Sequence, residues 1–407
     1  MRVILHADLN NFYASVETKL NPELAGKNVG VCGNVENRHG IILAKSEGAK
    51  KLGVKTGMTI NDAKHLCPDI VLVEAKHSHY TAYSKLVKDI YRDYTDRIES
   101  FGIDECWLDV TESVKLFGSG EKIADTIRER VKNEIGLTVS VGVSFNKVFA
   151  KLGSDLKKPD GTTVISVDNY KQKVWQLPVE DLLFVGKSTA QKLKKINVKT
   201  IGDLARIDVL YLEKHFGKWG VTLSDYANGK DDAPVLKDAE STEIKSVGNS
   251  ITSYRDLTTI EDVKIMFTAL SETVSSRVLS YGLGSATTLS IYVRDSFLNS
   301  STRQGRLHEP SVLPEDFKNF AIELFNRNYD LSVGIRTIGL SVSGFDDSAR
   351  QISLDGDFYE KKLKLNGAIS DIKGKYGNQS VVKGIVLKDK KLVRDDGEGT
   401  SLDRFDL

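Results

Sequence analysis

The chain has 407 residues, 40% of them hydrophobic, which is too long for one compact core and predicts roughly two to four domains. Its 57 basic residues nearly cancel its 56 acidic ones, so net charge does not indicate a nucleic-acid or membrane partner, and such a function must rest on motifs. The chain has three cysteines, Cys32, Cys67 and Cys106. An odd number argues against a disulfide framework, and their spacing is not that of metal ligands. No apolar run approaches the ~18 residues of a membrane span, so we expect a soluble, cytoplasmic protein without a membrane partner.

The first elements in chain order are a strand and a helix. The apolar run "RVILHADLN" predicts a buried strand, and "NNFYASVETKLNP" predicts a helix that is capped by Asn10 or Asn11 and ends before Pro22. The runs "NVGVCGN" and "GIILAK" predict two more strands. Residues 46–69 then predict two short helical pieces that glycines separate.

A longer helical pattern over residues 77–97 leads into "SFGIDECWLDV", residues 100–110, which predicts a hairpin bearing the acidic pair Asp104 and Glu105. Because no regular βαβ repeat is present, we expect an α+β architecture. The elements predicted after the hairpin are a helix over residues 121–134, the strand "LTVSVGVS", a helix over residues 146–157 and, after a Pro-Asp-Gly turn, the strand "TTVIS".

The second half of the chain changes character twice. Residues 170–238 predict only helices, and the polar stretch that follows suits a linker. Residues 244–345 return to mixed strands and helices, with "ATTLSIYVR" and "IRTIGLSVSGF" as the clearest strands. From about residue 351 the tail is rich in Lys, Asp and Gly, and we expect it to be less ordered.

Three carboxylates indicate a site. Asp8 ends the first strand, and Asp104 and Glu105 lie in the predicted hairpin; as a dipeptide alone, the latter pair suits a solvated turn equally well. If the first strand and the hairpin are neighbours in one sheet, the three acids converge and need cations between them. Oxygen ligands favour Mg²⁺ over Zn²⁺, and two such ions suit in-line phosphoryl transfer.

Lysines near this site suit an anionic substrate. The helix over residues 146–157 carries Lys147 and Lys151 on the face opposite its apolar residues, and Lys158 follows beside a turn, where its ammonium group could reach a triphosphate. A solvated lysine face explains the same pattern. The start of the helix after Asp8 offers free amides and a positive dipole end to the same anion.

A second nucleic-acid signal is "LLFVGKSTAQKLKKINVKTIGDLARI". An apolar turn with a glycine precedes a helix start, a lysine-rich segment and a second helix, as in a helix-hairpin-helix. Such a hairpin offers backbone amides to a DNA phosphate without reading bases. We expect this contact at Gly186, Lys187 and Thr189, although an ordinary helical hairpin fits the segment as well.

Taken in order, these pieces resemble the Y-family DNA polymerases, the translesion enzymes, over about residues 1 to 345. The resemblance favours the UmuC-like, UV-damage-repair branch of bacteria or phage, with DinB as a near relative. The matching motifs are "HADLNNFYASVE", "SFGIDECWLDV", "VSVGVSFNKVFAKLGSDLKKPDGTTVI", "TIGDLA", "FGKWGVTLSDYANGKDDAPV" and "KSVGNSIT".

The resemblance implies a multidomain right hand. Its parts are a catalytic palm (residues 1–10 and 77–165), fingers (11–76), a thumb with the helix-hairpin-helix (166–238), a linker (239–243), a little finger (244–350) and a C-terminal tail (351–407).

The resemblance also implies roles for individual residues. Asp8, Asp104 and Glu105, with the Leu9 carbonyl, would hold two Mg²⁺ ions. Lys158 and Lys50 would contact the triphosphate of a dNTP, and Tyr13 would be the steric gate that excludes ribonucleotides.

The sequence departs from the family in three places. Relatives often carry Ser-Tyr-Glu-Ala-Arg where this chain has Ser46-Glu47-Gly48-Ala49-Lys50, so one triphosphate contact is missing and Lys50 replaces an arginine fork. In the thumb, Phe184-Val185-Gly186 keeps only the second glycine of Gly-x-Gly. The little finger is not basic, so its DNA contacts would depend on local residues, namely Lys245, Arg255 and Arg294.

The sequence therefore predicts a monomeric DNA-directed DNA polymerase that acts on primer-template DNA and dNTPs. The alternatives are a non-catalytic DNA-binding accessory subunit, which should have lost a carboxylate, and a protein-templated nucleotidyl transferase, which should carry an insertion. In the tail, "RQISLDGD" resembles a sliding-clamp peptide through Gln351, Ile352 and Leu354, although Asp355 replaces its aromatic anchor.

Overall fold

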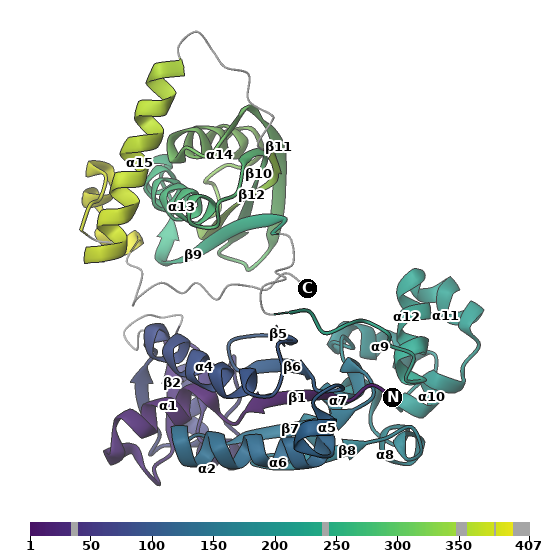
Figure 1. Cartoon of the computed structure of the whole chain (residues 1–407). Helices are drawn as coiled ribbons and strands as arrows, with labels where there is room; N and C mark the ends of the chain where they lie inside the picture. The colour runs from purple at the N-terminus through teal and green to yellow at the C-terminus, as the bar shows by residue number, and fades with distance from the viewer. Residues whose placement is uncertain (34–39, 238–243, 347–355, 378–379, 394–407) are drawn as a thin grey trace. The chain divides into compact units, whose positions relative to one another are not determined.

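The computed structural model describes residues 1–33, 40–237, 244–346, 356–377 and 380–393 (Figure 1). These residues divide into two compact units, one ending at residue 237 and the other starting at residue 244. Each unit has its own hydrophobic core and is described by itself. None of the helices in the described ranges is long and apolar enough to span a bilayer.

A five-stranded sheet forms the centre of the N-terminal unit. β1 is its middle strand and pairs antiparallel with β6 and β7, as expected for a first strand that neighbours the acidic hairpin. The strands, in sheet order, are β5 (Ile98–Ser100), β6 (Glu105–Asp109), β1 (Ile4–Leu9), β7 (Val139–Ser144) and β8 (Thr162–Ile165), with β7 and β8 parallel.

The two faces of this sheet differ because alternate residues of a strand point to opposite sides. Leu5, Ala7 and Leu9 of β1 belong to the main core, which contains apolar residues of α4 and α6. Ile4, His6 and Asp8 point to the other face, where α7 packs. The helices around this sheet are α4 (His77–Arg92), α5 (Val114–Phe117), α6 (Gly120–Arg130) with its continuation η2 (Val131–Ile135), and α7 (Lys147–Leu156).

Helix α7 lies unusually close to β7. A Cβ atom on Gly142 would come within 1.9 Å of the Ala150 carbonyl oxygen, so no other residue fits there without moving the helix. The Asn146 side chain accepts a hydrogen bond from the Phe149 amide and begins the helix. This close packing fixes the height of the α7 side chains above β1.

A smaller sheet precedes α4. It has the order β3-β2-β4, and the strands and helical pieces predicted before residue 77 are present. Its elements are α1 (Phe12–Leu20), η1 (Pro22–Leu24), β2 (Val29–Cys32), β3 (Ile42–Lys45), α2 (Glu47–Lys51), α3 (Ile60–Leu66) and β4 (Val71–Glu74).

The helix predicted over residues 77–97 ends earlier, at Arg92. The Thr95 hydroxyl donates to the Asp109 carbonyl at 2.7 Å, and the Asp109 amide donates to the Arg97 carbonyl at 3.1 Å. These bonds tie the segment to β6 before β5 begins, a tertiary constraint that the helical pattern does not contain.

Residues 170–237 contain helices and no strand, as predicted, and pack around a core of their own. The Thr200 and Asp203 side chains form a capping box that starts α10. The helices are α8 (Tyr170–Val174), η3 (Val179–Asp181), α9 (Lys187–Lys195), α10 (Ile201–Arg206), α11 (Val209–Phe216) and α12 (Lys218–Ala227).

The C-terminal unit is a four-stranded antiparallel sheet whose helices α13 and α14 cover one face (Figure 1). Its strand order is β11-β10-β12-β9. The elements are β9 (Ser246–Leu257), α13 (Ile260–Ser280), β10 (Ser285–Asp295), β11 (Ser300–Ser311), α14 (Pro314–Asn328) and β12 (Ile335–Asp346).

The expectation of a less ordered tail is wrong for residues 356–377 and 380–393. They form α15 (Gly356–Tyr376), η4 (Gly384–Lys388) and η5 (Lys390–Leu392). The Lys373 ammonium lies 2.7 Å from the Glu272 carboxylate of α13, and Val386 and Leu392 are buried in the core of the unit. The polar composition concealed a few apolar residues whose partners lie in remote elements, chiefly α13 and β9.

Candidate active site

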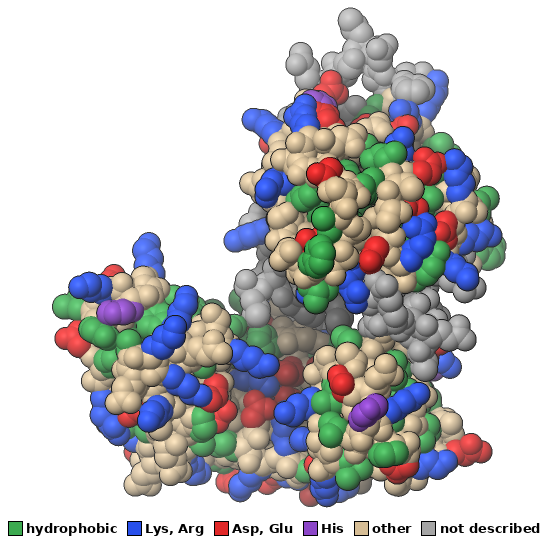
Figure 2. Space-filling model, turned by 180° about the vertical axis from the view of Figure 1, so that it is seen from behind, with side chains coloured by type: hydrophobic (Ala, Val, Ile, Leu, Met, Phe, Trp, Pro, Cys, Tyr) green, Lys and Arg blue, Asp and Glu red, His purple; other side chains and the backbone are tan. Residues whose placement is uncertain are grey.

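The carboxylates converge as the sequence predicts. Asp8 lies opposite Glu105 across β1 and β6, and the Leu9 amide donates to the Asp104 carbonyl at 3.1 Å. The Glu105 side chain is only 22% exposed and Asp104 is half-buried, so the solvated-turn alternative is wrong for this pair. Figure 2 shows acidic side chains gathered in a hollow of the N-terminal unit, with basic side chains at its rims.

The pKa values of two acids in this cluster, Asp104 and Glu105, are shifted in opposite directions. Burial, together with the charges of Glu105 and Asp8, raises the pKa of Asp104 to about 7. Burial also opposes ionisation of Glu105, but contacts with His6 and Lys151 outweigh it and lower the pKa of Glu105 to about 2. The cluster contains the acids Asp8, Asp104, Glu105 and Asp155 but two lysines, so it holds more acids than cations.

Two lysines are inserted among the carboxylates. The Lys151 Nζ lies 3.1 Å from Asp8 Oδ2, 3.0 Å from Glu105 Oε2 and 3.3 Å from Asp155 Oδ2. The Lys158 Nζ lies 2.7 Å from both Asp8 Oδ2 and Asp155 Oδ1. Since the Lys151 side chain is 14% exposed, the alternative of a solvated lysine face is wrong for Lys151; Lys158 is more exposed but is held by its two ion pairs.

His6 belongs to this site, although no sequence motif predicted a role for it. Its fully buried ring places Nδ1 at 2.9 Å from the Ser154 hydroxyl of α7 and Nε2 at 3.3 Å from Glu105 Oε2. The available signal was its position two residues before Asp8, on the same face of β1. The ring therefore connects the strand, the acidic hairpin and α7.

The donors at this site are oxygen atoms of a kind that hard cations prefer. Within the described ranges, no group of three or more Asp, Glu, His or Cys side chains is arranged as it stands to hold a metal ion. Here the Lys151 ammonium lies between Asp8 and Glu105 and contacts both. The chemistry of the set fits a divalent ion that takes the place of this ammonium group.

Tyr13 lies in the first turn of α1, beside the acids. Its ring is half-buried and stacks on Tyr80 with centroids 3.9 Å apart, and it meets His77 edge to face. Burial and the charge of Asp104 raise the pKa of Tyr13 to about 12. The ring therefore packs against the core and lies close enough to Asp104 to feel its charge.

The fingers segment contributes cations from two elements. Glu47, which replaces the expected tyrosine, accepts a hydrogen bond from the Asn11 side chain at 3.2 Å and lies 3.8 Å from the Lys50 ammonium. Lys45, a second residue missed by sequence, ends β3. Burial and the charges of Lys50 and Lys158 lower the pKa of Lys45, and its ammonium lies 3.0 Å from the uncharged Thr56 hydroxyl.

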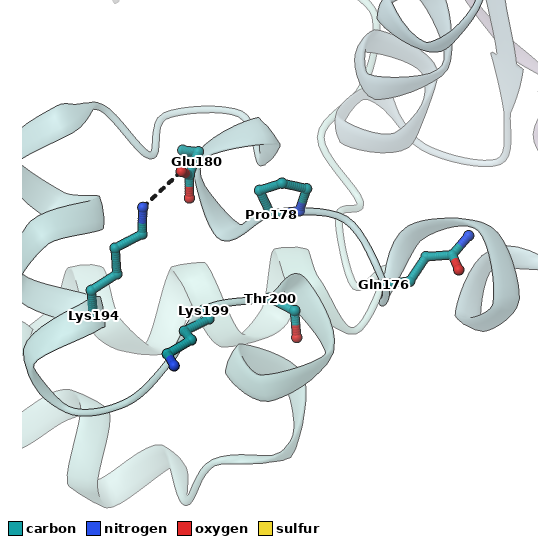
Figure 3. Close-up of a pocket in the computed structure, with 6 residues that line it drawn as sticks. All are labelled: Gln176, Pro178, Glu180, Lys194, Lys199 and Thr200. Atoms are coloured by element: carbon teal, nitrogen blue, oxygen red, sulfur yellow. Dashed lines mark hydrogen bonds and ion pairs between the residues drawn. The ribbon is translucent and has the colours of Figure 1, made fainter.

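In the thumb, Gly186 is the N-cap of α9 and is exposed together with Lys187, while Thr189 is half-buried. A cavity of about 440 Å³ lies between α9 and α10 (Figure 3). It contains the Lys194–Glu180 ion pair at 2.8 Å and no residue of the acidic cluster. Its lining residues are Gln176, Pro178, Glu180, Lys194, Lys199 and Thr200.

The C-terminal unit places its three expected DNA-binding residues differently. Lys245 is exposed just before β9, and Arg294 is half-buried on β10. The Arg255 guanidinium forms a fork with Asp262, at 2.7 and 3.1 Å, and also contacts Asp389 at 3.1 Å. Its role in this structure is thus to hold α13 and the tail together.

The residues expected to bind a clamp, Gln351, Ile352 and Leu354, lie outside the described residues.

Comparison with protein families gives three matches along the chain. Residues 7–155 match the impB/mucB/samB family, and residues 244–354 match the C-terminal domain of that family. Residues 180–231 match the thumb domain of DNA polymerase-iota. The three matches follow the order of the sheet, helical and second-sheet regions.

Individual proteins are similar over nearly the whole chain. A DNA polymerase IV of Acetivibrio thermocellus is 50% identical over 397 residues, covering 97% of this chain and 99% of the relative. A DNA polymerase IV of Clostridium kluyveri is 36% identical, covering 96% and 99%. Among solved structures, a Y-family DNA polymerase chimera of Dbh and Dpo4 superposes with a TM-score of 0.73 at 24% identity, covering 84% of this chain and 99% of that one. DinB from Sulfolobus solfataricus superposes with a TM-score of 0.56 at 25% identity over the same shares of the two chains.

Proposed function

This chain belongs to the Y family of DNA polymerases, and from that premise we propose that it extends primers past damaged bases. Its reaction is template-directed: the primer 3′ hydroxyl attacks the α-phosphate of a dNTP and pyrophosphate leaves. The sequence motifs favoured the UmuC-like branch, with DinB as a near relative; the relatives named DNA polymerase IV support the DinB-related branch instead.

The observation that supports catalysis is the convergence of three carboxylates and two lysines at one end of β1. An accessory subunit that only binds DNA has no use for this buried charge, which costs stability when it lacks ligands. None of the three acids is replaced, so the non-catalytic alternative is disfavoured.

Two Mg²⁺ ions are the proposed cofactor. Asp8, Asp104 and Glu105, with the Leu9 carbonyl, would hold them, and the ions would neutralise charge on the phosphates and activate the attacking oxygen. Lys151 and Lys158 would then give up their contacts with Asp8. Freed of that contact, the Lys158 ammonium would bind the triphosphate.

The remaining triphosphate contacts would come from the fingers. Lys50 and Lys45 lie near enough to act on each other's charge, and Lys45 also feels Lys158. The ammonium groups of Lys50, in α2, and of Lys158, in the turn after α7, repel that of Lys45 until an anion is placed between them. We include Lys45 in the dNTP site, where it would compensate for the tyrosine that Glu47 replaces. The Tyr13 ring would exclude ribonucleotides, because it occupies the space that a 2′ hydroxyl needs.

Duplex DNA would lie on the amides at Gly186, Lys187 and Thr189, and on Lys245 and Arg294 of the little finger. Arg255 is already held by two carboxylates and would contribute less than these residues.

We propose a monomer that uses Gln351, Ile352 and Leu354 to bind a sliding clamp weakly. Clamp retention that survives the double change Gln351→Ala and Leu354→Ala would contradict this partner.

The function is tested by primer extension on undamaged templates and on templates that carry one lesion. The purified chain should add nucleotides opposite and beyond the lesion in Mg²⁺. Extension that always stops before the lesion contradicts the translesion role, and no extension on either template contradicts polymerase activity.

A further inference from the structure

Phe184 has a backbone conformation that aromatic residues rarely adopt. Its φ angle is +67°, in the left-handed region, where the Cβ atom clashes with the backbone. The described ranges contain four other non-glycine residues with positive φ, of which three are Asn or Asp, whose short polar side chains tolerate the region. A phenylalanine in this conformation indicates a compensating contact.

The strain arises at a turn that favours glycine. The Val185 amide donates to the Leu182 carbonyl at 3.0 Å, which makes Phe184 the third residue of a four-residue turn. This position requires positive φ in a type II turn, and here related polymerases usually have the first glycine of Gly-x-Gly. The turn leads directly to Gly186 and the N-terminus of α9.

The Phe184 ring contacts aromatic residues of two different regions. It meets Phe101 of the acidic hairpin edge to face, with centroids 6.4 Å apart. On α12 it meets Trp219 at 6.0 Å and Tyr226 at 6.3 Å. The ring is 36% exposed, so it lies at the surface of the N-terminal unit and not within its core.

Phe101 connects this group to the catalytic acids. Its amide donates to the Glu105 carbonyl at 2.9 Å, and its ring contacts Trp107 with centroids 4.6 Å apart. The Trp107 ring in turn lies 5.2 Å from that of His6. A continuous row of rings therefore joins the proposed DNA-binding turn to the residues around Glu105.

We propose that Phe184 is a positioning residue that holds the thumb hairpin at a fixed place relative to the catalytic hairpin. This inference rests on the proposed function. DNA bound at Gly186 would then present its primer end in line with the acids, where small displacements cost rate steeply. Glycine would form the turn without strain but would remove the ring that contacts Phe101, and leave Leu183 as the apolar contact of this turn with the Trp107 cluster.

The experiment compares Phe184→Gly with Phe184→Tyr in the full chain. The glycine variant should fold, because the turn favours glycine, and should bind primer-template with unchanged affinity. The fraction of bound primer extended in the first turnover should fall roughly three- to tenfold, as expected for the loss of aromatic contacts. Phe184→Tyr keeps the ring and should restore that fraction.

A second variant identifies the contact that matters. Trp219→Leu should lower the productive fraction as Phe184→Gly does, and the double variant should be no worse than the worse single one. Tyr376→Ala, which removes an exposed ring from α15, serves as the control and should have no effect.

Equal productive fractions in wild type and Phe184→Gly would overturn the proposal, as would additive losses in the double variant. Either result leaves polymerase activity in place, whereas a wild-type chain that extends no primer contradicts the proposed function itself.

Discussion

Asp8 in the N-terminal unit and Asp262 in the C-terminal unit are buried to the same extent, each 6% exposed. Asp262 is fully partnered by the fold: Arg255 forms a fork with it, and the amides of Thr258 and Thr259 donate to it at the start of α13. Among the described residues, the side-chain partners of Asp8 are the ammonium groups of Lys151 and Lys158, in a cluster that contains three further acids, Asp104, Glu105 and Asp155.

The difference shows that burial alone does not distinguish a structural acid from a catalytic one. The surrounding partners do, because a charge that the fold satisfies completely has no capacity left for a ligand. Two further pairs differ in their surroundings. Lys45 lies near other cations whereas Arg255 is held by two carboxylates, and Tyr13 lies beside the catalytic acids whereas Tyr329 stacks in the C-terminal unit. Each pair gives an experiment in which one member should affect catalysis and the other only stability.

The largest effect is expected for the acids. Asp104→Ala, like Asp8→Ala or Glu105→Ala, should lower the single-turnover rate of nucleotide addition by about a thousandfold or more, because charge on the phosphates is then no longer neutralised. Affinity for primer-template DNA should change little. Asp262→Asn is the matched control and should keep the wild-type rate. Near-wild-type extension by Asp104→Ala in Mg²⁺ would contradict the assignment of these acids as the catalytic site.

The tyrosines should differ in sugar selection. Tyr13→Ala should lower the preference for dNTPs over rNTPs by roughly a hundredfold, because the ring no longer displaces a ribonucleotide from the reacting geometry. Tyr329 stacks on Phe325 with centroids 5.5 Å apart, and Tyr329→Ala should reduce thermal stability without changing the preference. An unchanged rNTP-to-dNTP ratio in folded Tyr13→Ala means that Tyr13 is not the gate.

The cations should differ in nucleotide affinity. Lys45→Met should raise the KM for dNTPs roughly tenfold with little change in kcat, since it removes one charge-assisted contact made equally in ground and transition states. Arg255→Met should leave this KM unchanged and lower the melting temperature. A KM that is the same in wild type and Lys45→Met would exclude Lys45 from the dNTP site.

The smallest effect concerns stability and pH. The hydrogen bonds from Arg255 lower the pKa of Asp262 to about 2, below its value of about 4 in an unfolded chain. The carboxylate therefore stabilises the fold above about pH 4, and this contribution disappears as the pH falls toward about 2. Asp262→Asn should reduce the free energy of unfolding by about 1–2 kcal/mol at neutral pH. Acid titration of both proteins should show that difference shrinking; a constant difference would contradict the ion pair as its source.

Much of the N-terminal unit was predictable because its signals are local. "ILHADL" is an apolar run ending at an acid, and it forms β1 with Asp8 near its end. The acidic pair was expected in a hairpin and is found there. The helix predicted over residues 146–157 forms α7, with Asn146 at its cap. In the C-terminal unit the strand runs were equally clear, but the ordered tail was not, because its apolar residues are few and its hydrogen bonds and ion pairs with α13 join positions about 90 to 130 apart.

By itself the sequence determined which segments form strands and helices, and which residues could serve a phosphoryl-transfer site, since side-chain periodicity and residue chemistry act over a few neighbouring positions. Tertiary structure alone decided which charges meet. Lys151 reaches Asp8 and Glu105 because Gly142 lets α7 approach β7, and His6 contacts Glu105 because β6 pairs with β1 in one register. Arg255 was an equally reasonable candidate by sequence, and only the packing of α13 and the tail shows that its charge is already satisfied. Electrostatic contacts depend on distances between remote segments, which no local pattern encodes.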